Sequence, residues 1–140
     1  MIKLSALGLD IGRKRIGVAG CDGLGLFATG LMTLRRKSFQ EDVRRFQEIV
    51  TEREVTVLVV GLPYSMSGDI GYQAKQVQKY ARRLSSALNL SLEFMDERLT
   101  SVAAQELMKA DKISVSQNKA LIDRKAAAII LQQWLDARRG

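Results

Sequence analysis

The sequence predicts an α/β fold in which a mixed sheet carries helices on both faces. The first sign is residues 4–11, where hydrophobic side chains recur with the period of two that is typical of a strand. The second is the uninterrupted run VTVLVVGLP at 55–63, which is typical of a central strand buried on both faces. The third is the order of elements, because a strand-rich start followed by alternating helices and strands favours a mixed sheet.

The first part of the chain is expected to form three consecutive strands. In the first strand Leu7, Leu9 and Ile11 lie on one side, and Gly8 and Asp10 lie on the other. Glycine and aspartate punctuate the boundaries of the next two strands, which are expected at 15–21 and within 24–34.

Helical periodicity dominates the rest of the chain. Ser38 is the predicted N-cap of a first helix, in which Phe39, Val43, Phe46 and Val50 recur at helical spacing. The other helices are expected at 71–88, from Thr100 or Ser101 onwards, and at 118–137. A short strand is expected to begin at 91, and loops are expected at 65–72 and 109–118. At 140 residues the chain is long enough for one core, so residues 1–140 are expected to form a single domain.

Composition excludes several kinds of chemistry. The chain has no histidine and one cysteine, which removes Ser-His-Asp and Cys-His catalysis and the usual zinc sites. Any catalysis must therefore use carboxylates, lysine, hydroxyls or a hard metal ion. No hydrophobic run is long enough to span a bilayer, and the N-terminus does not read as a signal peptide, so a cytoplasmic protein without membrane contact is expected.

The charge balance favours a polyanionic partner. Lys and Arg number 22 against 15 Asp and Glu, a net charge of +7, and nucleic acid is the simplest partner for such a surplus. Four cations and no acid occur in the helix at 71–88, opposite its hydrophobic stripe: Lys75, Lys79, Arg82 and Arg83. A solvated helix usually mixes charges, so this face suits a phosphate backbone, although a merely solvated basic face is the alternative. The cluster Arg35-Arg36-Lys37 could extend the same patch.

Three acidic positions lie on or beside hydrophobic elements. Asp10 falls inside a buried strand, where an ionised carboxylate is costly unless it is paired or binds a metal. Its structural alternative is an ion pair with Arg13 or Arg15. Asp96 and Glu97 directly follow a strand, at the end where α/β sheets place ligands, and capping of the next helix is their alternative.

Asp123 is the third acid. It shares a helical stripe with Ala127, Ile130 and Trp134, so it is expected to point towards the core unless the helix begins later and Asp123 is its N-cap. Several converging acids in a chain without histidine suit Mg²⁺ or Mn²⁺, and two such ions could clamp a phosphodiester for in-line displacement.

Four motifs in this order resemble those of the YqgF family, also called RuvX. They are LGLDIGRKRIGVAG followed by Asp22, VVGLPYSMSGDIG, DERLTS, and LIDRKAAAIILQQWL, and the resemblance covers nearly the whole chain. Members of this family are described as Holliday junction resolvases and as nucleases of pre-16S ribosomal RNA. The resemblance implies a ribonuclease H-like fold with a mixed five-stranded sheet, and phosphodiester cleavage by metal-bound carboxylates.

By motif position, the resemblance assigns both the catalytic and the metal-binding roles to Asp10, Glu97 and Asp123, with Asp96 as the less favoured second acid. Within the GLPYSMSG segment Ser65 and Ser67 replace an Asn and an Asp that are usual in the family, so that loop is assigned no catalytic role. Nucleic-acid contacts are expected from the cations nearest these motifs and on the basic helix: Arg13, Lys14, Arg15, Lys75, Lys79, Arg82, Arg83 and Arg98.

The leading hypothesis is a metal-dependent nuclease that matures the 5′ end of precursor 16S ribosomal RNA, with ribosomal precursor particles as a partner. RNA is favoured over branched DNA because a junction resolvase usually acts as a symmetric dimer, and the sequence shows no clear dimer face, so a monomer or weak dimer is expected. Two other hypotheses stay open. Asp-x-Gly before a hairpin also resembles the phosphate-binding element of actin-like ATPases and sugar kinases, and a non-catalytic RNA- or ribosome-binding factor would use the acids structurally.

Overall fold

The computed structural model of the chain describes residues 4–63, 71–96 and 119–139. The elements follow one another as β1 (Ala6–Ile11), β2 (Arg15–Cys21), β3 (Ala28–Arg35), α1 (Phe39–Arg53), β4 (Val57–Leu62), α2 (Tyr72–Leu88), β5 (Ser91–Asp96) and α4 (Lys119–Arg139). The predicted strands and three of the predicted helices are therefore present, with ends shifted by a few residues. The helix expected from Thr100 or Ser101 and the loop at 109–118 lie outside the described residues, as does most of the loop at 65–72.

The five strands form one mixed sheet in the order β3-β2-β1-β4-β5. β1 pairs antiparallel with β2, and β2 with β3, whereas β1 and β4, and β4 and β5, run parallel. All six residues of β4 are buried, which confirms the central strand that its β-branched composition predicts. The carboxyl ends of β1, β4 and β5 consequently lie at the same end of the sheet.

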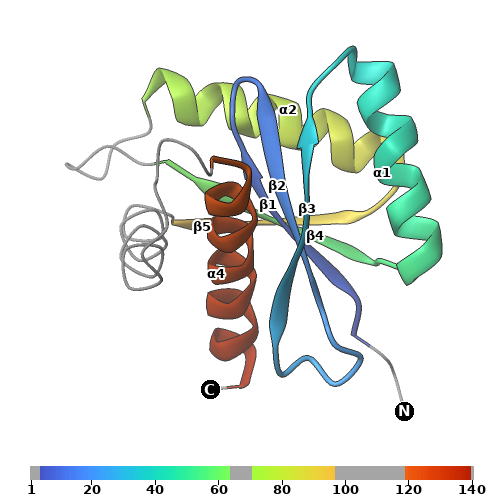
Figure 1. The fold of residues 1–140 in the computed structure, drawn as a ribbon, viewed down its shortest axis with the longest axis vertical. Coiled ribbons are helices and arrows are strands. Elements are labelled where there is room, and N and C mark those ends of the chain that lie inside the picture. Colours follow the sequence, from blue (N-terminus) through green and yellow to red (C-terminus); the bar gives the residue numbers. More distant parts are fainter. Residues whose placement is uncertain (1–3, 64–70, 97–118, 140) are drawn as a thin grey trace.

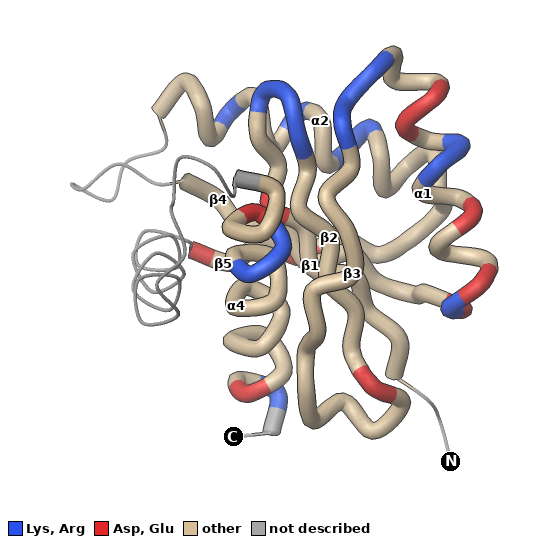
Figure 2. Tube along the Cα trace, viewed as in Figure 1, with Lys and Arg blue, Asp and Glu red and all other residues tan. Residues whose placement is uncertain are grey.

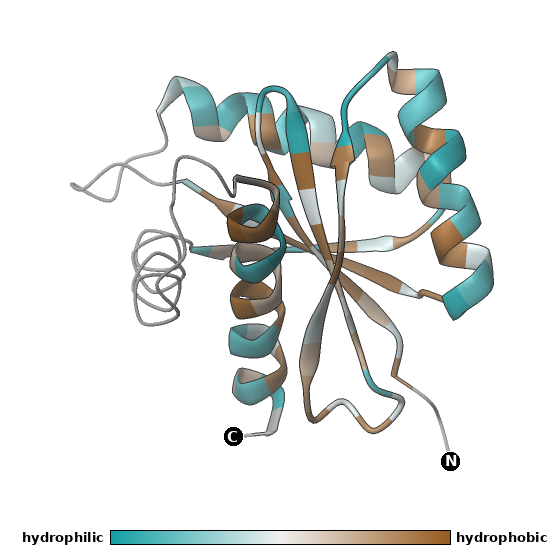
Figure 3. Cartoon of the chain, in the orientation of Figure 1, coloured by the Kyte–Doolittle hydropathy of each residue, from teal (hydrophilic) through white to brown (hydrophobic). Residues whose placement is uncertain are grey.

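The helices cover the two faces of the sheet unequally (Figure 1). α1 and α2 pack on one face, around a core that includes Leu7, Leu9 and Ile11 of β1. Among the described helices, α4 covers β1 and β2 on the other face, where Ala127, Ile130 and Leu131 join a second core. Hydrophobic residues concentrate on the strands between these layers, while the outer surfaces of the helices are more hydrophilic (Figure 3).

Local signals in the sequence set the ends of α1. The Ser38 side chain accepts a hydrogen bond of 3.2 Å from the backbone N–H of Glu41, which confirms Ser38 as the N-cap. The helix ends at Glu54, which adopts a left-handed conformation with φ of 54°. Within the described parts of the chain, no helix combines the length and the hydropathy needed to cross a bilayer.

Candidate functional site

Strand alternation places Asp10 on the face of the sheet that α4 covers. Ala6 belongs to the core beneath α4, whereas Leu7 and Leu9 belong to the opposite core. A Cβ atom added to Gly8 would lie 2.7 Å from the Cβ atom of Leu131, so Gly8 also faces α4. Asp10, two residues further and partly buried, therefore projects from the carboxyl end of β1 on the side of α4.

Gly17 brings Asp123 next to Asp10. Gly17 of β2 is the register partner of Asp10 in the antiparallel pair. A Cβ atom at Gly17 would lie only 2.0 Å from the backbone oxygen of Asp123, so the α4 backbone rests directly on this glycine. Since residues opposite each other on paired strands are immediate neighbours, α4 presents Asp123 beside Asp10. The structure thus brings together two of the three predicted acids, from segments far apart in the sequence.

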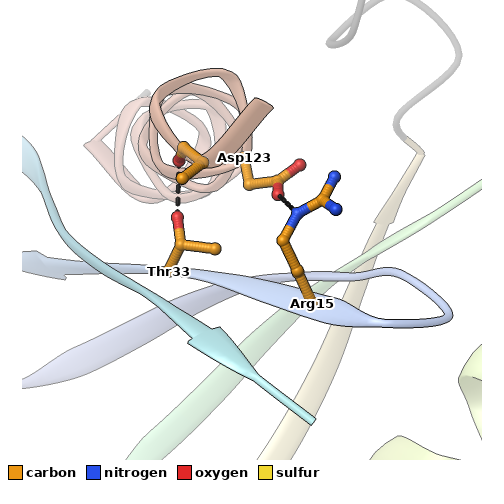
Figure 4. Close-up of polar contacts among 4 residues, drawn as sticks. Arg15, Thr33 and Asp123 are labelled. Carbon is orange, nitrogen blue, oxygen red and sulfur yellow. Dashed lines mark hydrogen bonds and ion pairs between the residues drawn. The ribbon is translucent and has the colours of Figure 1, made fainter. Parts of the chain in front are cut away.

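Asp123 also forms an ion pair with an arginine of β2. The Arg15 Nε–H donates to Oδ2 of Asp123 over 2.7 Å, and the two side chains are 35% and 20% exposed (Figure 4). On the same part of the helix the Thr33 hydroxyl donates to the backbone oxygen of Ala120, which ties α4 to β3. α4 already includes Lys119, so Asp123 lies inside the helix and the N-cap interpretation of Asp123 is wrong.

Asp96 lies at the same end of the sheet but on its other face. β5 pairs Leu62 with Asp96 in parallel register, and Leu62 belongs to the core beneath α1 and α2. Paired residues on neighbouring strands point to the same face, so Asp96 points away from Asp10 and Asp123. Glu97 and Arg98, which the sequence proposes as an acid of the site and a nucleic-acid contact, lie outside the described residues. No group of three or more candidate metal-ligating side chains occurs within the described ranges.

The cations surround this end of the sheet (Figure 2). Arg13 and Lys14 form the exposed β1–β2 turn, and the segment after β3 and the outer face of α2 carry further positive charges beside it. The four α2 cations that the sequence marks are all exposed, and the hydrophobic stripe opposite them is buried. Of these four, Lys79 and Arg83 also line the cavity between α2 and the turn.

This cavity, of about 420 Å³, includes residues that sequence analysis did not mark individually. In the sequence, Arg36 is marked only as a member of the basic cluster Arg35-Arg36-Lys37, and Tyr72 and Tyr80 carry no signal beyond helical periodicity. The Tyr80 hydroxyl donates to the buried carboxylate of Asp42 over 2.9 Å. Burial, together with this hydrogen bond, raises the pKa of Tyr80 well above its usual range.

The fold is that of ribonuclease H-like resolvases, as predicted. RuvC of T. thermophilus bound to a Holliday junction superposes with a TM-score of 0.57, at 15% identity, covering 98% of this chain and 96% of that one. The Fowlpox virus resolvase in its junction complex gives a TM-score of 0.60 at 10% identity, covering 98% of this chain and all of that one (100%). At such identities the likeness establishes the fold alone.

Sequence comparison identifies the family. Residues 4–137 match the family described as "RuvX: Holliday junction resolvase", and the chain belongs to it. A protein of Gloeothece citriformis named "Putative pre-16S rRNA nuclease" is 64% identical over 137 residues, which are 98% of this chain and 91% of that protein. One of the same name from Trichormus variabilis is 63% identical over 136 residues, 97% and 90% of the two chains. Family membership confirms the predicted enzyme class, a nuclease that hydrolyses phosphodiester bonds.

Proposed function

We propose that this protein is a divalent-metal-dependent nuclease that cleaves RNA in the 5′-end maturation of precursor 16S ribosomal RNA. The observation that carries the proposal is that the Asp123 backbone lies against Gly17, the register partner of Asp10, at the carboxyl end of β1 and beside the cationic β1–β2 turn. The names of the relatives from Gloeothece citriformis and Trichormus variabilis support RNA as the substrate.

The residues present fit a hard divalent cation. Asp10 and Asp123 offer oxygen ligands from two elements on one face, and the Arg15 guanidinium already places a positive charge against Asp123. We propose Glu97 as the third ligand, because strand alternation turns Asp96 to the opposite face. Mg²⁺ or Mn²⁺ is the proposed cofactor, as a pair of ions. When bound, such ions supply charge stabilisation for the phosphate and an activated water for attack.

The chain itself would position the substrate. The side chains of Arg13 and Lys14 are exposed at the tip of the β1–β2 turn, which directly follows Asp10 and Ile11 on β1. A phosphate backbone lying across this turn would meet cationic side chains on one side and the two carboxylates on the other. Gly17 would keep Asp123 close to Asp10, and Arg15 would hold the Asp123 carboxylate in place before the substrate arrives.

The test is cleavage of a structured precursor RNA with Mg²⁺ or Mn²⁺ by the parent and by Asp10→Asn and Asp123→Asn. Loss of a group that only supports a metal ligand typically costs 10- to 100-fold, so loss of a ligand should lower the rate by about a hundredfold or more. Asp22→Asn is the matched control, because Asp22 lies in the turn at the opposite end of the sheet. Cleavage by either site variant at the parental rate would refute the proposal.

Branched DNA is the second candidate substrate, because the family description names a Holliday junction resolvase. A four-way DNA junction should therefore be assayed beside the RNA, together with the mass of the protein in solution, since symmetric cutting of a junction calls for a dimer. We propose a monomer or weak dimer that cuts the RNA faster. A stable dimer that cuts only the junction would reverse this choice of substrate. If no substrate is cleaved and the loss of either acid leaves RNA binding unchanged, the protein would instead be a non-catalytic binding factor.

A further inference from the structure

The cavity between the β1–β2 turn and α2 lies outside the proposed carboxylate site. Ile11 and Gly12 form part of its wall, and Ile11 points to the face of the sheet opposite Asp10. Asp10 and the cavity thus flank the same short stretch of backbone. At about 420 Å³, the cavity has the size of a small-molecule site.

Its wall is strongly cationic. Arg13, Arg36, Lys79 and Arg83 line the cavity, and none of the described residues that line it is acidic. Two of these cations are fixed in place: Arg36 stacks on the Tyr80 ring at 4.3 Å, and Arg83 stacks on the Phe39 ring at 4.1 Å. Arg36 also donates to the backbone oxygen of Gly12 over 2.8 Å. Cations held in this way bind an anion at a lower entropic cost than freely moving side chains do.

An exposed aromatic ring completes the cavity. Tyr72, in the first turn of α2, is 75% exposed although it is a large side chain, and it lines the same cavity as the cations. The amide side chains of Gln73 and Gln76 line the cavity next to it. An exposed ring beside a cationic wall is the arrangement that binds an unpaired base and its phosphate, because any base can stack on an aromatic ring.

We propose that this cavity binds one unpaired nucleotide of the substrate strand, with the base against Tyr72 and the phosphate among Arg13, Lys79 and Arg83. The inference rests on the proposed nuclease function and refines its substrate. The base must be out of a duplex to stack in this way. The protein would therefore select RNA that has a single-stranded segment next to the bond at the carboxylates.

The experiment measures binding in EDTA, where cleavage cannot occur, with the full chain and two RNA hairpins. One hairpin is blunt, and the other carries a single-stranded extension that contains a fluorescent adenine analogue. Tyr72→Ala should weaken binding of the extended hairpin about tenfold and leave binding of the blunt hairpin unchanged, whereas Tyr72→Phe should bind like the parent. Phe27→Ala is the matched control, because Phe27 is 68% exposed in the turn at the other end of the sheet.

The fluorescence of the analogue gives a second readout. Stacking should quench it on binding to the parent and to Tyr72→Phe, but not on binding to Tyr72→Ala. The inference would be overturned if Tyr72→Ala bound the extended hairpin with the same affinity and the same quenching as the parent. It would also be overturned if micromolar AMP displaced the extended hairpin, because the cavity would then be a site for free nucleotides. Neither result would bear on the nuclease proposal, because that proposal is tested by the cleavage rates of the Asp10→Asn and Asp123→Asn variants.

Discussion

The ion pair between Arg15 and Asp123 is the contact that most directly affects the chemistry of the proposed site. Its 2.7 Å hydrogen bond occupies an oxygen of a proposed metal ligand with a guanidinium N–H. A divalent cation bound to Asp123 would have to share that carboxylate with Arg15 or displace it. Arg15 would then be available for the negatively charged substrate, so metal and nucleic acid would assist each other's binding.

Arg15→Gln is therefore expected to raise the affinity for Mn²⁺ in the absence of RNA. Partly exposed ion pairs contribute up to about 1 kcal/mol, so the gain should be roughly fivefold, measured by calorimetric titration. Lys14→Gln is the matched control, because it removes the same charge from the exposed tip of the same turn. If both variants gained equally, the effect would come from overall charge and not from the ion pair.

Tyr80 provides a prediction about pH. Its pKa is raised above the usual 10.0, chiefly by burial and then by its hydrogen bond to Asp42, so the folded protein holds this proton more tightly than the unfolded chain. The contribution to stability is complete below pH 10.0 and is lost as the pH rises through the folded pKa. Urea unfolding should show stability falling above that pH.

Tyr80→Phe should change both the level and the pH dependence of stability. At neutral pH it should be less stable by about 1–3 kcal/mol, because the carboxylate of Asp42, which is 1% exposed, loses a donor. Its stability should then decline less steeply than that of the parent at alkaline pH. An equally steep decline in the variant would show that other groups cause the alkaline loss.

At the residue scale, the sequence could predict which acids interrupt hydrophobic elements but not all of their contacts. Asp10 and Asp123 were identifiable because each interrupts a hydrophobic pattern, and that signal is local. The partner of Arg15 was not identifiable: the sequence offers Arg13 or Arg15 only as an alternative ion-pair partner for Asp10, whereas the bond of Arg15 to Asp123 joins residues 108 positions apart. Only the packing of α4 on the sheet decides that contact.

The position of α4 depends on glycines in three strands. Gly8, Gly17 and Gly30 all lie beneath the helix, and an added Cβ atom would come within 2.7, 2.0 and 3.1 Å of its atoms, respectively. Because these residues have no side chain, the helix backbone can approach the sheet closely. The same approach brings Asp123 close to Asp10, so the glycines shape the proposed site as well as the packing of α4.

Gly17→Ala should consequently separate the two carboxylates. The added methyl group would meet the backbone of Asp123 and force the first turns of α4 outwards, at a cost of about 3 kcal/mol. Both the midpoint of urea unfolding and the affinity for Mn²⁺ should fall. Gly23→Ala is the control, because nothing lies within 4 Å of a Cβ atom at that position. Unchanged Mn²⁺ affinity in Gly17→Ala would mean that the metal does not bind between these two elements.

At the scale of elements, periodicity predicted most of the fold. The period of two in β1 and the β-branched run of β4 identified both strands and the central position of β4, and Ser38 marked the start of α1. Periodicity also placed Gly8 and Asp10 on the same side of β1. It could not reveal which helix covers that side, because this depends on contacts between β1 and a helix more than a hundred residues later.

At the scale of the whole molecule, charge is distributed unevenly. The surplus of positive charge predicted a polyanionic partner, but a count of residues cannot say where the charges gather. In the structure, the β1–β2 turn, the segment after β3 and α2 bring their cations to the end of the sheet that holds Asp10 and Asp123 (Figure 2). Since the two hydrophobic cores lie on either side of one sheet, we infer that residues 1–140 act as a single domain.

This distribution predicts which cations bind the phosphate backbone. The logarithm of RNA affinity should fall linearly with the logarithm of salt concentration, with a slope set by the number of neutralised phosphates. Lys79→Gln should reduce this slope by about one and weaken binding to RNA of any sequence, because Lys79 lines the cationic cavity. Arg44→Gln removes the same charge from the exposed face of α1, away from that cavity, and should leave the slope unchanged. Equal effects of the two variants would mean that net charge alone attracts the RNA, whereas a change confined to Lys79→Gln would locate the strand at the end of the sheet where the carboxylates lie.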